Sequence, residues 1–354
     1  MKILYGVQGT GNGHISRSRA MAFELQLRGI EVDFIFSGRP PEQYFDMEIF
    51  GDYRCFNGLT FATEKGRVNY LKTLTASQPV NFWHETKALD LGGYDLVITD
   101  FEPVSAWAAR LAKIPTLGVG HQYAFNYPIP RAGETLITRK VMQYFAPTRY
   151  SLGLHWHHFD QPILPPIVAH DSQPSVTNNA ADFILVYLPF EDSAAVIQLL
   201  QGFSNTRFTL YSNTHPAGDF GNISVHPLSR AGFATSLQHC QGVICNTGFE
   251  LISEALTLGK PILSKPLARQ MEQLSNAVAL ERLQLGTIMT SLEVQAVEFW
   301  LDRAAPVTVY YPNVTGAICD WLLAAQFEHI DSLCHQLWQQ TCCPQHPALF
   351  ATNC

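Results

Sequence analysis

The chain has 354 residues, of which 47% are hydrophobic and 15% are charged, and its formal net charge is -7. This composition is typical of a well-buried globular protein and excludes a disordered chain. The acidic balance argues against general binding of nucleic acid, which requires a basic face. The length exceeds that of one typical hydrophobic core and suits two α/β domains.

Two features of the whole chain bear on its location. The N-terminus reaches a glycine turn after a few residues, which is too short for a secretory signal, and no run of about 18 apolar residues could span a membrane. The cysteines include no Cys-x-x-Cys pair, a usage typical of a reducing compartment rather than of a disulfide scaffold. We therefore expect a cytoplasmic protein.

The first part of the chain alternates predicted strands with predicted helices. Residues 2–7 form a buried strand, and a glycine turn then leads into a helix over 14–28 that ends at Gly29, a residue suited to a helix C-terminus. Such alternation predicts a parallel sheet covered by helices. The further elements predicted here are strands at 32–36, 95–99 and 116–119 and a helix at about 104–112.

A proline-rich segment then divides the chain. Residues 159–177 lack periodicity and are interrupted by prolines, which indicates a linker between domains. A second alternating series follows, so we predict two Rossmann-like, doubly wound parallel-sheet domains that face each other across a cleft. The expected divisions are an N-terminal domain over 1–160, a linker over 161–180 and a second domain over 181–312. The strands of the second series are predicted at 183–188, 207–211, 223–226, 242–245, 261–264 and 286–289.

The most informative pattern lies where the strand at 242–245 ends. A small-residue turn, Asn246-Thr247-Gly248, leads into a helix that carries Glu254 two turns further on. Backbone N–H groups and the helix macrodipole at such a turn can hold a diphosphate, and a carboxylate on the same helix can accept hydrogen bonds from ribose hydroxyls. The alternative is an ordinary strand–helix turn with a helix-capping Asn246 and a solvated Glu254.

This order of features resembles the donor site of GT-B glycosyltransferases, in particular the UDP-glycosyltransferases and the family 28 enzymes, which include the lipid-linked N-acetylglucosaminyltransferase of peptidoglycan synthesis. The resemblance implies that Glu254 binds the ribose and that Glu272 and Gln273 touch the donor sugar. It also implies a nucleotide-sugar substrate, no cofactor, and a helix within 313–354 that crosses back to the first domain. The donor-binding residues implied are Asn246, Thr247, Gly248, Phe249, Glu254, Glu272, Gln273 and Asn276.

A second glycine motif, from Gly9 to His14, opens the first predicted helix. A dinucleotide fingerprint, Gly-x-Gly-x-x-Gly, would need glycine where His14 stands, and no acid ends the second strand, so the motif does not favour NAD. The motif resembles the first loop of the family 28 transferases, which adds a match in the other domain. The resemblance places Gly11, Asn12 and Gly13 on the acceptor side.

His14 has a chemical use in an inverting transferase. A histidine of near-neutral pKa suits the general base that deprotonates an acceptor hydroxyl, and a carboxylate that orients the base improves it. Asp100 ends a strand beside the first strand and could reach His14, as in the histidine–aspartate dyad of the UDP-glycosyltransferases. Two alternatives stay open: His14 only binds the acceptor, or Asp100 only caps the helix after Pro103. His121, after the strand at 116–119, is expected on the acceptor side of the same cleft.

Two acidic or histidine-rich clusters suggest metal sites that we do not favour. Asp100-Phe101-Glu102 has the acid-x-acid form of another glycosyltransferase fold, but a helix-held diphosphate makes a metal unnecessary. His155-Trp156-His157-His158 lies in a predicted extended segment, where His155 and His157 could share a face, but no matching ligands are evident elsewhere. We therefore expect no metal.

The leading hypothesis is an inverting, metal-independent transfer of a sugar from a nucleotide-sugar, with UDP as the expected nucleotide, to a hydroxyl acceptor. The alternatives are a nucleotide-sugar 2-epimerase of the same fold and a non-catalytic nucleotide-sugar binder. The sequence does not identify the hydroxyl acceptor; a lipid-linked or cell-envelope glycan is one candidate, with at most peripheral contact of the protein to the inner face of the plasma membrane. Basic residues beside Tyr144 and Phe145 suit contact with anionic lipid, although a solvated helix face is the favoured interpretation. These residues are Arg131, Arg139, Lys140 and Arg149.

Overall fold

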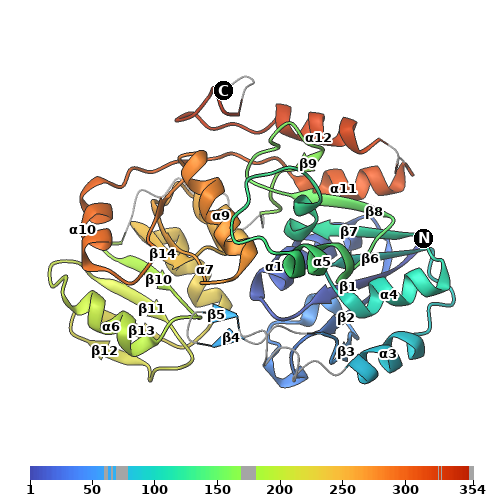
Figure 1. Cartoon of the computed structure of the whole chain (residues 1–354), viewed down its shortest axis with the longest axis horizontal. Helices are drawn as coiled ribbons and strands as arrows, with labels where there is room; N and C mark the ends of the chain where they lie inside the picture. Colours follow the sequence, from blue (N-terminus) through green and yellow to red (C-terminus); the bar gives the residue numbers. More distant parts are fainter. Residues whose placement is uncertain are drawn as a thin grey trace.

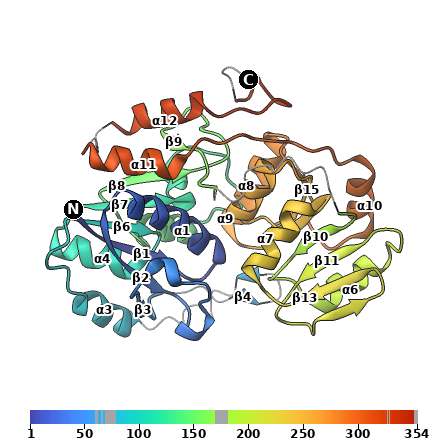
Figure 2. The ribbon, with the colours of Figure 1, turned by 180° about the vertical axis from the view of Figure 1, so that it is seen from behind.

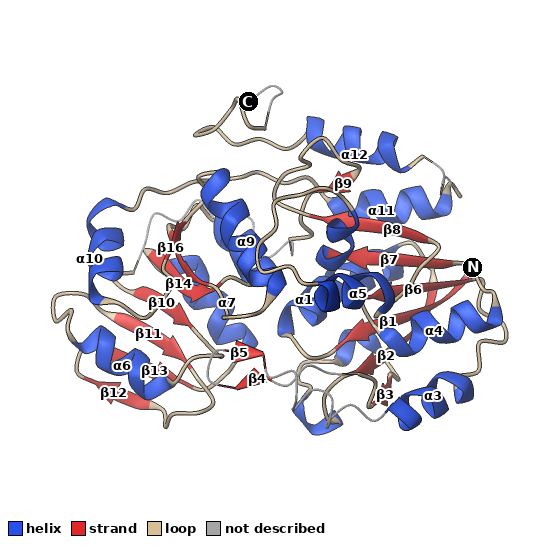
Figure 3. Cartoon of the chain, viewed as in Figure 1, coloured by secondary structure: helices blue, strands red, loops and turns tan. Residues whose placement is uncertain are grey.

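The chain forms two seven-stranded sheets that lie next to each other, with helices packed on each (Figure 1, Figure 3). This computed structural model describes residues 1–59, 63–64, 67–68, 79–168, 181–325, 327 and 329–350. The prediction of two parallel-sheet α/β domains is confirmed. A small antiparallel pair, β4 (Thr63–Glu64) with β5 (Arg67–Val68), lies outside both sheets.

The first sheet is entirely parallel and is buried on both faces. Its strand order is β3-β2-β1-β6-β7-β8-β9. Along β1, Tyr5 belongs to the core cluster that contains Met21 of α1, whereas the neighbouring Leu4 packs with Val104 of α4. Helices therefore cover both faces, as continuous apolar strands require. The elements are β1 Lys2–Gln8, α1 Asn12–Leu27, β2 Glu31–Ser37, β3 Arg54–Phe56, α3 Pro79–Ala88, β6 Leu96–Asp100, α4 Pro103–Ala112, β7 Thr116–Gly120, the 3-10 segment η3 His121–Asn126, α5 Leu136–Tyr144, β8 Tyr150–Leu154 and β9 Ile163–Leu164, with two further 3-10 turns, η1 Pro41–Gln43 and η2 Glu48–Phe50.

The second sheet has the order β12-β13-β11-β10-β14-β15-β16, and its edge strand β12 is antiparallel to β13. Val186 of β10 packs with Leu200 of α6, whereas its neighbour Leu185 joins the cluster that contains Ile252 of α8. This sheet is therefore also covered on both faces. The elements are β10 Ile184–Tyr187, α6 Ser193–Gln201, β11 Phe208–Tyr211, β12 Gly218–Phe220, β13 Ile223–His226, α7 Arg230–His239, β14 Gly242–Asn246, α8 Phe249–Thr257, β15 Ile262–Lys265, α9 Met271–Arg282, β16 Thr287–Ile288 and α10 Val294–Arg303.

The last two helices, α11 (Val314–Leu323) and α12 (Ile330–Gln339), return to the first sheet, as Figures 1 and 2 show. Helix α11 packs against α1, and Arg28 Nε donates to Asp320 Oδ1 at 2.8 Å. On α12, Trp338 Nε1 donates to the carbonyl of Ile163 at 2.6 Å. The tail, for which the sequence indicates no role, thus covers the outer strands of the first sheet.

Two details differ from the sequence-based expectations. The predicted linker begins inside the first sheet, because Ile163 and Leu164 pair with β8, and the rest of it, 169–180, lies outside the described residues. Cys342 is disulfide-bonded, which was not foreseen.

Within the described part of the chain, no helix is long and apolar enough to cross a membrane. The free cysteines are Cys55, Cys240, Cys245, Cys319, Cys334 and Cys343.

Candidate active site

His14 and Asp100 meet at the carboxyl edge of the first sheet. The register of β1 and β6 places Asp100 beside Val7, and α1 begins a few residues after β1 ends. Nδ1 of His14, in the first turn of α1, lies 2.7 Å from Oδ1 of Asp100. The carboxylate can hold Nδ1–H, which leaves Nε2 as the basic nitrogen. The structure thus brings the two expected catalytic residues into direct contact.

Arg17, which the sequence analysis missed, completes this arrangement. It is buried, and its Nε and Nη2 atoms donate to the two oxygens of Asp100 at 2.9 and 2.5 Å. Burial alone would raise the pKa of Asp100, but Arg17 and His14 outweigh burial and lower the pKa. Asp100 is therefore an anion at neutral pH. In the sequence, only the spacing could have indicated Arg17, because Arg17 follows His14 by one helical turn and therefore lies on the same face of α1.

Arg17 also joins the two domains. Its Nη1 atom donates to Oε1 of Glu250, in the first turn of α8. The domains approach so closely here that a Cβ atom on Gly13 would lie 2.8 Å from Cγ of Glu250. Gly13, expected on the acceptor side, therefore makes room for this contact. Glu250 is the second functional candidate that the sequence analysis missed, although it lies one turn before Glu254.

Glu102, rather than Asp100, caps the helix that follows β6. Its carboxylate accepts hydrogen bonds from the backbone of Val104 and Ser105 at 2.8 and 2.6 Å and from the hydroxyl of Ser37 at 2.6 Å. These donors commit both oxygens to the N-terminus of α4. The interpretation of Asp100 as that cap is wrong. Of the two acids in the acid-x-acid motif, Glu102 caps α4 and Asp100 contacts His14.

The predicted donor turn connects β14 to α8. Gly248 is the N-cap residue, and among the residues that the structure describes no side chain caps the free N–H groups of the first turn of α8. Such a helix end favours an anion. Thr247 is buried, and its hydroxyl oxygen accepts from Ser264 at 2.9 Å, so its side chain braces the turn. The turn therefore presents backbone groups rather than side chains.

Asn246 belongs to a polar cluster at the carboxyl edge of the second sheet. Its amide nitrogen donates to the carbonyl of Lys265 at 3.0 Å and to Glu191 at 3.3 Å, and Lys265 pairs with Glu191 at 2.8 Å. The amide oxygen of Asn246 is buried, and no described residue hydrogen-bonds to it.

Glu254 lies on α8 where the two domains face each other. The hydroxyl of Ser16, on α1, lies 3.4 Å from its Oε1. Burial raises the pKa of Glu254 to about 7, although Ser16 and the nearby Arg230 act in the opposite direction. The carboxyl group therefore lies at a contact between the domains, and burial places its pKa near neutral pH.

One cavity of about 250 Å³ lies between the domains and is lined by His14 and by three of the remaining predicted site residues. Gly11 and His14 line it from the first domain, and Glu272 and Gln273 line it from the second. Nε2 of Gln122 donates to Glu272 at 3.0 Å across the cavity. Oε1 of Gln273 accepts from the backbone N–H of Leu267 at 2.9 Å, which fixes the orientation of its amide. Asn12, which follows Gly11 in the glycine motif, accepts a hydrogen bond at its Oδ1 from Nη2 of Arg39 at 3.0 Å.

Three predicted site residues form the interface between the domains instead of lining this cavity. The rings of His121 and Phe249 stack with centroids 4.0 Å apart, and Trp156 packs on Phe249. His121 Nε2 lies 2.7 Å from Oδ1 of Asn276, whose amide nitrogen donates to the carbonyl of Thr247 at 3.1 Å. The side chains of His121, Phe249 and Asn276 thus contact each other and the predicted donor turn, and their roles on the acceptor and donor sides stay predictions. These side chains hold the domains together.

The histidine cluster at 155–158 also has a structural use. Nδ1 of His155, His157 and His158 each accepts a backbone N–H bond within the same turn, at 2.8 to 2.9 Å. His157 and His158 stack on each other, and His155 is buried against His121, so the expected alternation of faces is wrong. Within the described ranges, no group of three or more His, Cys, Asp or Glu residues could hold a metal ion.

Comparison with known proteins gives a family match over most of the chain. A model described as glycosyl transferase family 1 matches residues 1–305. An uncharacterised glycosyltransferase of Methanosarcina acetivorans is 30% identical over 151 residues, which are 41% of this chain and 38% of that protein. The match thus spans less than half of the length of this relative.

Solved structures share the fold at low sequence identity. MurG of Acinetobacter baumannii superposes with a TM-score of 0.53 at 14% identity, over 85% of this chain and 90% of MurG. The spinosyn rhamnosyltransferase SpnG, complexed with thymidine diphosphate, gives a TM-score of 0.56 at 12% identity, over 95% of this chain and 100% of SpnG. The arrangement of the two sheets is therefore that of GT-B glycosyltransferases.

Proposed function

Because the chain belongs to glycosyl transferase family 1 and is a glycosyltransferase, we propose that it moves a sugar with inversion from a nucleotide-sugar, expected to be UDP-linked, to a hydroxyl acceptor. One observation supports this proposal most. His14 of one domain and the pair Glu272 and Gln273 of the other line the same cavity. A base and a sugar-binding pair that face one space are what attack on an anomeric carbon requires.

The proposed reaction uses His14 as the base. Nε2 takes the proton of the acceptor hydroxyl while the hydroxyl oxygen bonds to the anomeric carbon, and the bond from that carbon to the diphosphate breaks with its electron pair on the diphosphate. Asp100, held ionised by Arg17, orients the imidazole and stabilises the imidazolium that forms. Attack opposite the leaving group inverts the anomeric configuration.

The second domain would hold the donor. The uncapped N-terminus of α8 would bind the diphosphate and stabilise its charge as it leaves, without a metal. Glu254 would accept hydrogen bonds from the ribose, and Gln273 would contact the sugar. The structure of SpnG is a complex with thymidine diphosphate, which supports a nucleoside diphosphate as part of the donor, so both uracil and thymine donors need testing.

We propose that the acceptor is a hydroxyl compound and that the reaction takes place in the cytoplasm. A lipid-linked or cell-envelope glycan is a candidate for this acceptor. The test is incubation with UDP-N-acetylglucosamine, UDP-glucose and TDP-glucose, without acceptor, followed by chromatography. Slow release of the nucleoside diphosphate, lost in His14→Ala, is the expected result. A new sugar nucleotide would indicate an epimerase, and binding without turnover would indicate a sensor. Either result would overturn the transfer proposal.

A further inference from the structure

Helices α1 and α8 pack against each other where the two domains meet (Figure 2). The hydroxyl of Ser16 lies 3.4 Å from Oε1 of Glu254, and Nη1 of Arg17 donates to Oε1 of Glu250, one turn earlier on α8. A Cβ atom on Gly13 would lie only 2.8 Å from Cγ of Glu250. The first turns of α1 therefore cover the side of α8 that carries both carboxyl groups.

The contact of Ser16 with Glu254 has the same chemistry as the contact that a donor would make. In the proposed function, Glu254 accepts hydrogen bonds from ribose hydroxyls, and the group that reaches it in this conformation is also a hydroxyl, that of Ser16. A carboxylate oxygen can accept more than one hydrogen bond. However, α1 covers this side of the carboxyl group, so a ribose can approach it only if Ser16 moves away.

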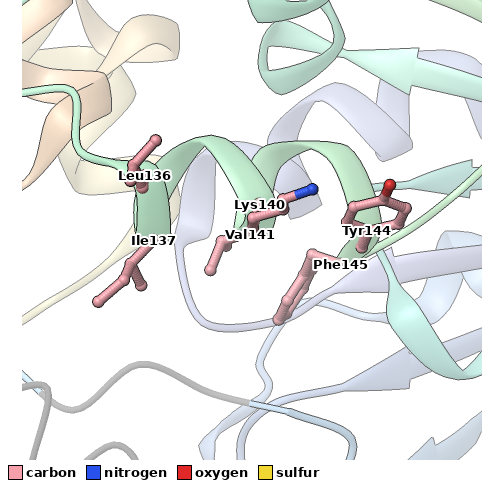
Figure 4. Close-up of a pocket in the computed structure, with 6 residues that line it drawn as sticks. All are labelled: Leu136, Ile137, Lys140, Val141, Tyr144 and Phe145. Atoms are coloured by element: carbon pink, nitrogen blue, oxygen red, sulfur yellow. The ribbon is translucent and has the colours of Figure 1, made fainter.

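Two hollows border the first domain, and neither provides room at Glu254. The cavity of about 250 Å³ at His14 is smaller than the roughly 300–1,000 Å³ of most small-molecule sites. None of the described residues that line this cavity belongs to α8. The larger groove, of about 530 Å³, is lined by α5 and Phe145 and by no described residue of the second domain (Figure 4). A ribose at Glu254 therefore needs space that α1 fills.

The contact between the helices buries more acid than base. Burial raises the pKa of Glu250 to about 8, with Arg17 acting against this rise and Asp100 and Glu254 adding to it. The pKa of Glu254 is raised by burial as well. Removing carboxyl groups from water costs free energy, which a guanidinium shared with Asp100 offsets only in part. The contact is therefore one that a ligand of α8 can displace.

We propose that the α1–α8 contact is a latch that competes with the donor: Ser16 holds Glu254 and Arg17 holds Glu250 until the helices part and the nucleotide takes their place. The competition at Glu254 rests on the proposed function, whereas the latch itself rests on the contacts between the helices. Arg17 keeps its bonds to Asp100 when the helices part, because both residues belong to the first domain. A donor that must first open the latch binds with a weaker apparent Kd, so removal of a latch contact should tighten binding.

A reversible crosslink tests the latch most directly. A Cβ atom on Gly13 would lie 3.3 Å from Cβ of Glu250, close to the roughly 3.5–4.5 Å that disulfides span. Gly13→Cys combined with Glu250→Cys should therefore form a disulfide on oxidation. By calorimetry, the oxidised protein should bind UDP at least about tenfold more weakly than the same protein after reduction. Glu250→Cys alone, treated identically, is the control and should bind UDP equally in both states.

UDP affinity that the crosslink leaves unchanged would overturn the latch, because the helices would not need to part. Loosening the contact should have the opposite effect. Ser16→Ala keeps Glu254 and should tighten UDP binding about two- to fivefold, the range of one net hydrogen bond. Glu250→Gln removes the charge that faces Arg17 and should tighten binding at least as much. Glu281→Gln, at an exposed residue of α9, should change nothing.

Unchanged or weaker UDP binding in either Ser16→Ala or Glu250→Gln would also overturn the inference. A measurement without nucleotide separates the latch from the proposed function. Exchange of amide hydrogens in α8, followed by mass spectrometry, should be faster in Glu250→Gln than in Glu281→Gln, because a helix that loses a packing contact opens more often. Equal exchange would overturn the latch whatever UDP does. Faster exchange in a protein whose parent does not bind UDP would keep the latch and reject the proposed donor site.

Discussion

Nδ1 of His14 lies 2.7 Å from Oδ1 of Asp100, and the two residues come from different elements, α1 and β6. The contact fixes the imidazole at the edge of the cavity that Glu272 and Gln273 line from the other domain. The buried guanidinium of Arg17 keeps Asp100 ionised. We therefore propose acid–base chemistry in the first domain and donor binding in the second.

Removal of the base should affect turnover and not donor binding. His14→Ala is expected to lower kcat by about a hundredfold or more, because general base catalysis contributes about that much. The Kd for the nucleotide-sugar should stay within about twofold. Steady-state kinetics and calorimetry check the two quantities, with His226→Ala on the exposed end of β13 as control. Unchanged kcat with a weakened Kd would make His14 a binding residue.

Arg17 is expected to matter for stability as well as for activity. Arg17→Met leaves the buried Asp100 and the partly buried Glu250 without their shared cation, and removal of one partner from a buried ion pair costs about 3–5 kcal/mol. The free energy of unfolding in urea measures this loss. The exposed pair Arg207–Asp182 provides the control, because Arg207→Met should cost less than about 1 kcal/mol. Equal losses in the two variants would show that the Arg17 pairs are not structural.

Gln273 should distinguish the donor sugar from the nucleotide. Gln273→Glu keeps an oxygen for the N–H of Leu267 but removes the amide donors that would contact sugar hydroxyls. We expect weaker binding of UDP-sugar by about fivefold and nearly unchanged binding of free UDP, since a hydrogen bond to a neutral partner contributes about 1 kcal/mol. Parallel calorimetric titrations provide the comparison. An equal loss for both ligands would contradict the assignment of Gln273 to the sugar.

Activity should not depend on a divalent cation. The helix N-terminus at Gly248 is proposed to stabilise the leaving diphosphate, and Glu102 is committed to capping α4. Turnover should therefore persist after dialysis against excess EDTA. A sharp loss that magnesium or manganese restores would return Asp100 and its neighbourhood to consideration as a metal site.

Local sequence predicted the backbone features of the site well. The strand–turn–helix at Asn246 to Gly248 and the glycine turn before His14 follow from short-range chemistry, and both form as predicted. The pairing of His14 with Asp100 could also be anticipated, because the carboxyl ends of neighbouring parallel strands meet at one edge of a sheet.

Contacts between the domains could not be predicted from the sequence. Phe249, His121 and Asn276 occur in or beside recognisable motifs, yet their side chains bury each other across the interface. Arg17 and Glu250 are 233 positions apart and meet only because the domains face each other. Such long-range pairings depend on how the two domains dock, which no local period or spacing encodes.

Glu254 is expected to couple donor binding to pH. Burial raises its pKa to about 7, so the carboxylate is charged above that pH and neutral below it. Its hydrogen bonds to ribose hydroxyls are charge-assisted only in the ionised form. The advantage of the parent over Glu254→Gln in UDP affinity should therefore grow between pH 6 and pH 8. Ionisation of UDP itself affects both proteins and cancels in their ratio.

The most direct test of the donor site is the Kd of UDP for Glu254→Ala at pH 8, by calorimetry. Charge-assisted hydrogen bonds of about 1.5–3 kcal/mol predict a ten- to hundredfold weaker Kd than that of the parent. Replacing UDP by 2′-deoxy-UDP should weaken binding to the parent more than binding to the variant. Parental UDP affinity in a normally folded Glu254→Ala protein would contradict the donor-site assignment, and the proposed transfer mechanism with it.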